Sequence, residues 1–160
     1  MIARRLLLAG IAGLAVAPTP GSAQAQRIVA LGGDVAEIIA ALGRESLLVG
    51  CDETCVFPAA LARLPRAGYV RAFSAEGVLS LRPGAVVASA AAGPPAAIAQ
   101  LRAAGVPVAL IPEARDEASL IAKVRAVGAA IGAREPAELL AGDIAARLDR
   151  LERRVATDPR

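Results

Sequence analysis

The chain has 160 residues, which fits one domain, and a net charge of +3. Apolar residues make up 56% of it and aromatic residues only 2%, so its core must consist mainly of aliphatic side chains. Its basic residues are scattered with few aromatics among them, which excludes the usual pattern of a nucleic-acid-binding protein.

Residues 1–25 have the organisation of a secretory signal peptide. Arg4 and Arg5 form a positive start, and residues 6–17 form an apolar run too short to span a bilayer comfortably. Residues 23–25, Ala-Gln-Ala, supply a small-x-small cleavage pattern, so we expect a periplasmic chain that begins near Gln26. The alternative is an uncleaved membrane anchor.

The next segment pairs an apolar strand with a helix. Residues 27–31 predict the strand, which ends in Gly32-Gly33. Asp34 with Glu37 has the spacing of a capping box that opens a helix, and Gly43 is a natural stop for it.

The same alternation continues to residue 131. Apolar runs predict further strands at 47–50, 85–89 and 107–111. Between and after them we expect a helical turn within 59–64, a short helix capped by Ser74, a helix that starts at Pro94-Pro95, and a helix opened by Asp116 or Ser119. Strands that are apolar throughout and alternate with helices indicate a parallel sheet covered on both faces. The predicted fold class is therefore α/β, a Rossmann-like three-layer parallel sheet of about four strands.

The last segment predicts one long helix with a narrow apolar stripe. From Pro136 onward, apolar residues recur at helical spacing, at Leu140, Ile144, Leu148, Leu151 and Val155. Two acidic–basic pairs one turn apart, Asp143 with Arg147 and Asp149 with Arg153, can form on the other side. No strand follows for this helix to return to.

Tyr69 is the only tyrosine of a chain that has no histidine. It is the side chain best placed to reach a metal-centred ligand, and Arg71 follows two residues later. The alternative is an ordinary tyrosine whose ring packs and whose hydroxyl lies at the surface. Gly33 is a second candidate, because amides after a parallel strand point out at the edge where ligands of open α/β sheets collect. Its alternative role is a tight strand-to-helix turn.

Cys51 and Cys55 stand four residues apart. In an exported protein they can close a small disulfide, remain as two free thiols or take a ligand role, and the sequence leaves these three open. It holds no recognisable nucleophile setting, so we expect no catalytic residue and no enzyme.

Residues 68–77 read Gly-Tyr-x-Arg-Ala-x-Ser-Ala-Glu-Gly, after a Cys-Asp-Glu-Thr segment and a Phe-Pro loop. With the opening strand and helix, this resembles the N-terminal lobe of a periplasmic haem-binding protein. That family serves haem-uptake ABC transporters within the siderophore- and cobalamin-binding group. The resemblance runs from about Arg27 to Ile131.

The resemblance implies a haem held between two lobes that a long helix joins. Its axial iron ligand falls on Tyr69, its arginine partner on Arg71, and the glutamate that docks on the inner-membrane permease on Glu76. Haem is then the transported ligand, and an outer-membrane receptor system is involved indirectly.

On this basis residues 26–133 form the N-terminal ligand-binding lobe, and residues 134–160 begin the interlobe helix of a chain expected to be truncated, without its second lobe. One alternative ligand is cobalamin or a ferric siderophore. Alternatives of other classes are a small exported α/β enzyme and a structural exported domain without a ligand.

Overall fold

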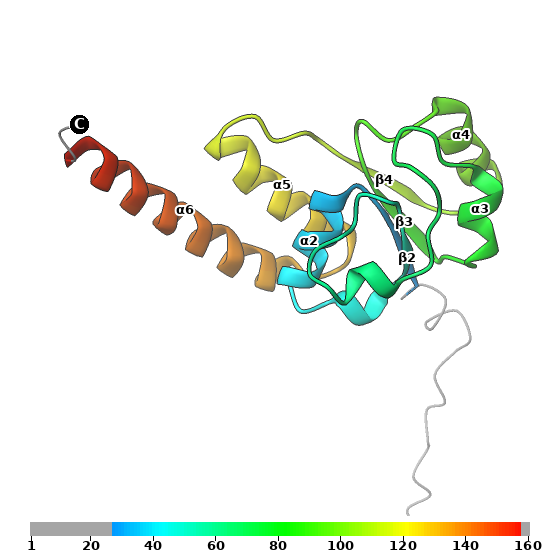
Figure 1. Ribbon diagram of the computed structural model, residues 1–160, viewed down its shortest axis with the longest axis horizontal. Helices are drawn as coiled ribbons and strands as arrows, with labels where there is room; N and C mark the ends of the chain where they lie inside the picture. Colours follow the sequence, from blue (N-terminus) through cyan, green and yellow to red (C-terminus); the bar gives the residue numbers. More distant parts are fainter. Residues whose placement is uncertain (1–26, 158–160) are drawn as a thin grey trace, which may run out of the picture.

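Four parallel strands form one sheet in the order β2-β1-β3-β4 (Figure 1). The computed structural model describes residues 27–157, so the predicted signal peptide lies outside the described residues. The strands are β1 (Ile28–Leu31), β2 (Leu48–Cys51), β3 (Ala85–Ser89) and β4 (Val108–Ile111). In the central pair, Val29 of β1 lies opposite Val86 of β3. The predicted parallel α/β sheet is confirmed.

Helices cover both faces of this sheet. They are α2 (Gly33–Ala41), α3 (Ala75–Ser80), α4 (Pro95–Ala103), α5 (Glu117–Ala130) and α6 (Arg134–Thr157), with short 3-10 turns η1 (Glu45–Leu47) and η2 (Leu61–Arg63). One core cluster joins α2, α5 and the start of α6 to one face, and a second joins α3 and α4 to the other (Figure 1). Successive strand residues such as Val29 and Ala30 fall in opposite clusters, because side chains alternate across a sheet.

Three predicted helix starts are confirmed, that of α4 at Pro95 among them. The Ser74 hydroxyl accepts a hydrogen bond from the Gly77 amide at 3.0 Å, which caps α3. At α5, Asp116 and Ser119 together form a capping box, so the two candidates share one cap.

The predicted capping box of Asp34 and Glu37 is wrong. Helix α2 begins at Gly33, and its N-cap is Gly32, which makes no side-chain capping bond. Gly32 has a φ of 125°, a conformation that side chains rarely adopt, so the chain turns into the helix earlier than expected. Asp34 therefore lies inside the first turn, and its carboxylate pairs with Lys123.

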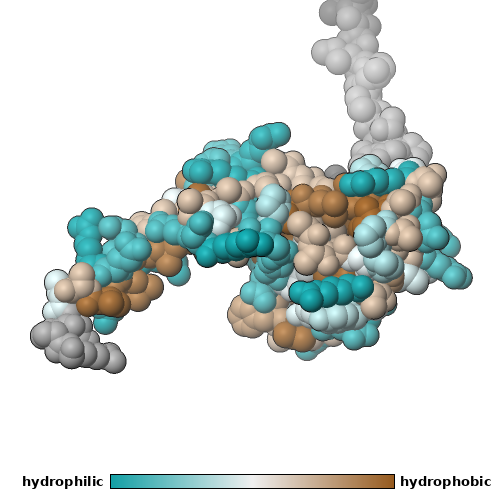
Figure 2. Space-filling model, turned by 90° about the horizontal axis from the view of Figure 1, so that it is seen from above, coloured by the Kyte–Doolittle hydropathy of each residue, from teal (hydrophilic) through white to brown (hydrophobic). Residues whose placement is uncertain are grey.

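Only the first half of α6 packs against the rest of the chain. A Cβ at Gly128 of α5 would lie 2.2 Å from the Cβ of Ala137, so the two helices approach closely where Ala137 and Ala141 are buried. Farther along, Leu151 is 54% exposed and Val155 is 73% exposed. In Figure 1 this part of α6 projects away from the sheet, and Figure 2 shows hydrophobic side chains along the projecting arm.

Polar pairs run along the exposed side of the same helix. The predicted pair of Asp143 with Arg147 has a nitrogen–oxygen distance of 2.7 Å, and Asp149 with Arg153 one of 2.9 Å. Within residues 27–157, no helix combines the length and the apolar character needed to cross a bilayer.

Candidate ligand-binding site

The loop that carries Tyr69 is hydrogen-bonded to the carboxyl end of β2 and to the turn that follows it. Arg66 forms an isolated parallel β-bridge with Cys51, and the next residue, Ala67, donates a backbone hydrogen bond to the Cys51 carbonyl at 2.9 Å. The Glu53 amide donates to the Gly68 carbonyl at 3.0 Å. Gly68 has a φ of 95°, and a Cβ there would lie 3.3 Å from the backbone of Phe73, so glycine suits this bend.

The loop is also held on its other side. The Gly93 amide, in the loop after β3, donates to the Val70 carbonyl at 2.9 Å. Phe73 is buried in the core between the sheet and α3 and α4. Strand order reverses between β1 and β3, and ligands of open α/β sheets bind beside such reversals. These bonds therefore fix the Tyr69 loop at the edge where a ligand is expected.

Tyr69 itself is 46% exposed. Within residues 27–157 no hydrogen bond joins its hydroxyl to another group. Arg71 and Glu76 are also exposed, Glu76 in the first turn of α3. The structure thus brings the three motif residues onto one loop and the helix that follows it.

Gly33 does not offer a free amide. Its N–H donates to the Thr54 hydroxyl at 2.8 Å, and a Cβ at this position would lie 2.7 Å from the Thr54 carbonyl oxygen. Its neighbour Gly32 donates to the carboxylate of buried Asp52. Gly33 therefore serves the tight turn, and we leave it out of the proposed site.

Asp52 is a residue that the sequence did not single out. Besides Gly32, its carboxylate accepts hydrogen bonds from the Thr54 amide at 2.8 Å and the Thr54 hydroxyl at 2.6 Å. It thereby ties the loop after β2 to the turn after β1. An aspartate directly after a buried strand was the available signal, because a buried carboxylate has to find donors.

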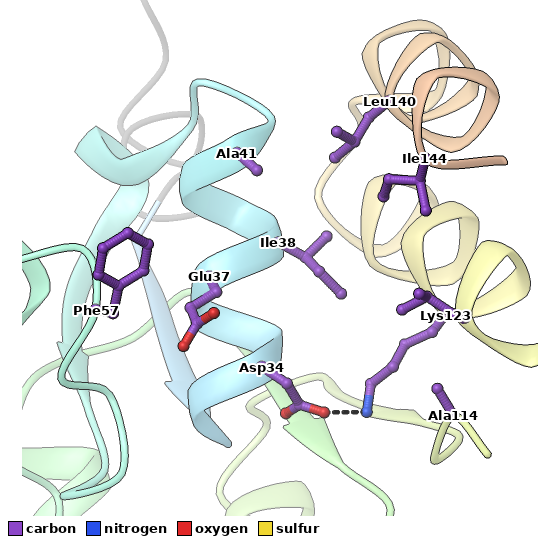
Figure 3. A pocket seen from close by; sticks show the side chains of 10 residues that line it. Asp34, Glu37, Ile38, Ala41, Phe57, Ala114, Lys123, Leu140 and Ile144 are labelled. Carbon is purple, nitrogen blue, oxygen red and sulfur yellow. Dashed lines mark hydrogen bonds and ion pairs between the residues drawn. The ribbon is translucent and has the colours of Figure 1, made fainter. Parts of the chain in front are cut away.

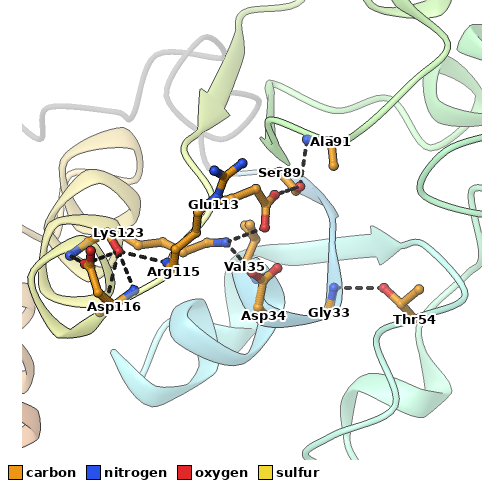
Figure 4. A network of polar contacts seen from close by, with 11 residues as sticks. Gly33, Asp34, Val35, Thr54, Ser89, Ala91, Glu113, Arg115, Asp116 and Lys123 are labelled. Carbon is orange, nitrogen blue, oxygen red and sulfur yellow. Dashed lines mark hydrogen bonds and ion pairs between the residues drawn. The ribbon is translucent and has the colours of Figure 1, made fainter.

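Lys123, the only lysine of the chain, was also missed. It is 2% exposed and pairs with Asp34, with Glu113 at 3.6 Å as a second partner (Figure 4). Glu113 in turn accepts a hydrogen bond from Ser89 at the end of β3. This network connects α2, β3 and α5 at the carboxyl edge of the sheet.

A mainly apolar groove of about 490 Å³ lies between α2, α5 and α6. In Figure 3, Ile38 points from α2 toward Leu140 and Ile144 of α6, and the pair of Asp34 with Lys123 closes one end. Phe57, 66% exposed, also lines the groove and in Figure 3 lies across α2 from the α6 side chains. Tyr69 is not among the lining residues, so the groove and the Tyr69 loop are separate features.

Both cysteines are free and buried, which corresponds to the second of the three alternatives. Arg66 donates to the Cys51 sulfur at 3.0 Å. A hydrogen bond with Cys55, followed by the Arg66 charge, lowers the pKa of Cys51 against the opposing effect of burial. The bond to Cys51, burial and the Asp52 charge raise the pKa of Cys55.

The sequence of residues 28–160 matches the family described as periplasmic binding protein. Among solved structures, this chain is similar to the periplasmic heme-binding protein RhuT from Roseiflexus sp. RS-1, with 42% sequence identity and a TM-score of 0.77. The match covers 83% of this chain and 52% of the RhuT chain. A periplasmic heme-binding protein from Pseudomonas aeruginosa is 40% identical with a TM-score of 0.78, covering 82% and 47%.

This chain is also similar, more distantly, to the periplasmic vitamin B12 binding protein BtuF of Vibrio cholerae. It is 25% identical, with a TM-score of 0.70, over 82% of this chain and 51% of its own. The chain thus spans about half the length of the solved structures that it matches. No curated protein sequence matches it.

Proposed function

Because this chain belongs to the periplasmic binding protein family, we propose that it forms the N-terminal lobe of a haem-binding protein that serves a haem-uptake ABC transporter. Residues 26–133 are the ligand-binding lobe, and residues 134–160 begin the helix toward a second lobe. Two of the solved structures that it resembles are periplasmic heme-binding proteins at 42% and 40% identity.

The observation that carries the proposal is the position of Tyr69. An aromatic ring normally gains free energy by burial, and a buried tyrosine hydroxyl normally has a partner. Here the ring is half-exposed and the hydroxyl has no partner within the described residues, although the loop around it is held from both sides. Such a rigid, unpartnered oxygen is available to a ligand.

Ferric haem fits this oxygen chemically. A tyrosine phenolate is a known axial ligand of haem iron. The Arg71 guanidinium, two residues away and exposed, can stabilise the phenolate or pair with a propionate through charge-assisted hydrogen bonds. We assign the contact with the permease to Glu76, which is exposed in the first turn of α3.

Export to the periplasm is part of the proposal. Its support is the family and the signal-like residues 1–25. Mass spectrometry of the protein from its native host should give an N-terminus near Gln26, and an intact Met1 would contradict export.

The test of the haem proposal is a titration of the purified chain with ferric haem, followed by the visible spectrum. We expect a high-spin, phenolate-type spectrum that Tyr69→Phe abolishes, because the ring stays and only the iron-binding oxygen is lost. Arg71→Ala should weaken binding without removing the spectrum. An unchanged spectrum in Tyr69→Phe would refute the ligand assignment.

Haem also adsorbs to exposed apolar surfaces, so the titration needs a matched control. Phe57 is an exposed aromatic residue that lines the groove, outside the Tyr69 loop. Phe57→Ala should bind haem like the wild type. An equal loss in Phe57→Ala and Tyr69→Phe would indicate adsorption and contradict a specific site.

Cobalamin is the second candidate ligand, supported by the similarity to BtuF. A parallel titration with cobalamin separates the two. Binding of cobalamin but not of haem would replace the haem proposal with this one.

A further inference from the structure

The turn that follows β2 contains two buried thiols whose surroundings differ. The Cys55 amide donates to the Asp52 carbonyl at 3.3 Å, which folds the chain back toward Cys51, and the two thiols interact closely enough that each shifts the pKa of the other. Arg66 clamps this turn, donating to the Cys51 sulfur at 3.0 Å, the Asp52 carbonyl at 2.7 Å and the Cys55 carbonyl at 3.0 Å. The Cys55 thiol donates to the Asp52 carboxylate at 3.4 Å.

These contacts assign different roles to the two sulfurs. A guanidinium beside Cys51 favours its thiolate, which is the reactive form of cysteine. A carboxylate beside Cys55 favours the form that keeps its proton. The directions of the two pKa shifts, lowered at Cys51 and raised at Cys55, agree with this assignment.

We propose that Cys51 and Cys55 form a redox-active pair that closes a reversible disulfide within the turn supporting the Tyr69 loop. The turn supports that loop through the bonds from Ala67 to Cys51 and from Glu53 to Gly68. The inference concerns a modification site and does not depend on which ligand the lobe binds.

Loss of the two thiol hydrogens would leave the groups that now contact them with other hydrogen-bond partners. The Leu61 carbonyl, 3.7 Å from the Cys51 sulfur, also accepts from the Leu64 amide. The Asp52 carboxylate keeps its bonds from Gly32 and Thr54 when the Cys55 hydrogen is lost. Arg66 keeps its three carbonyl acceptors, those of Asp52, Cys55 and Ala62.

The reaction is thiol–disulfide exchange, with a disulfide such as oxidised glutathione as the oxidant. The Cys51 thiolate attacks one glutathione sulfur, forms a mixed disulfide and releases a glutathione thiolate. The Cys55 sulfur then attacks Cys51 and displaces the second glutathione, which takes up the Cys55 proton. Two electrons pass from the two cysteines to glutathione. Because both thiols are fully buried, the first attack requires the turn to open.

The experiment equilibrates the purified full chain, without haem, in buffers of varied ratios of oxidised to reduced glutathione. Acid quenching, alkylation of remaining thiols and peptide mass analysis then report the state of each cysteine. We expect a product lighter by two hydrogen atoms that contains a 51–55 disulfide and is reversed by dithiothreitol. Thiols that stay fully alkylatable at every ratio, or a stable glutathione adduct as the wild-type end product, would overturn the proposal.

Single serine variants test the assigned roles. Cys55→Ser should accumulate a glutathione adduct on Cys51 about tenfold faster than Cys51→Ser accumulates one on Cys55, because the thiolate is the attacking form. Equal rates would refute the asymmetry. If either variant fails to fold, the wild-type peptide analysis still decides whether the pair closes. Since no haem is present, failure here is distinguishable from failure of the haem proposal.

Discussion

The Tyr69 loop and the far half of α6 both expose groups that proteins usually bury, but they are held very differently. The loop has backbone bonds to the turns after β2 and β3 and a buried phenylalanine at its end. The far half of α6 has its own helix bonds and two surface ion pairs. Exposure in an anchored loop indicates a place for a ligand, whereas exposure along an unanchored helix indicates local weakness. The predictions below test this difference.

The largest expected effect is at the loop's anchor. Phe73→Ala should lower the free energy of unfolding by about 3–5 kcal/mol, because it removes a buried ring and leaves a cavity. Urea denaturation measures this loss. The matched change at an exposed ring, Phe57→Ala, should stay within about 0.5 kcal/mol. Equal effects of the two variants would mean that Phe73 does not anchor the loop.

A smaller effect is expected where the loop enters α3. Ser74→Ala removes the capping oxygen of the Gly77 amide and should cost about 1 kcal/mol of unfolding free energy. Ser80→Ala, at the other end of the same helix, is the control, and its effect should be smaller because no orphan amide loses its partner there. If Ser80→Ala costs as much as Ser74→Ala, the cap does not explain the loop's position.

The smallest changes in unfolding free energy are expected from substitutions in α6. Asp149→Asn weakens an exposed pair one turn apart and should cost only about 0.3–0.5 kcal/mol. Hydrogen exchange should be fast after Arg147 and slow in the four strands, because an unpacked helix end has little stability of its own. Uniform protection through Val155 in a monomer would contradict the contrast between the two regions.

Much of this architecture could be predicted from local patterns. Apolar runs located the four strands to within a residue or two, and Ser74 and Asp116 marked two helix starts, because strand burial and helix capping leave local signals. The cap at Asp34 was predicted wrongly, because Gly32 starts the helix earlier and Lys123, far along the chain, takes the carboxylate.

The candidate site was predictable only in part. The motif nominated Tyr69, Arg71 and Glu76 as candidates, and the structure shows all three exposed, on one loop and the helix after it; their roles stay a proposal. The hydrogen bond from the Gly33 amide to Thr54 could not be predicted from the local sequence, because Thr54 lies in the loop after another strand. The different surroundings of the Cys51 and Cys55 thiols could not be predicted either, because they depend on Arg66, which is 15 residues from Cys51.

The most direct test of the central claim uses the fact that Tyr69 is the only tyrosine. Growth on ring-deuterated tyrosine therefore labels this residue alone, and resonance Raman spectra of the ferric haem complex can be compared with and without the label. Coordination by Tyr69 predicts phenolate bands that shift to lower frequency in the labelled protein. A haem complex whose bands are all unaffected by the label would show that iron is bound by another group.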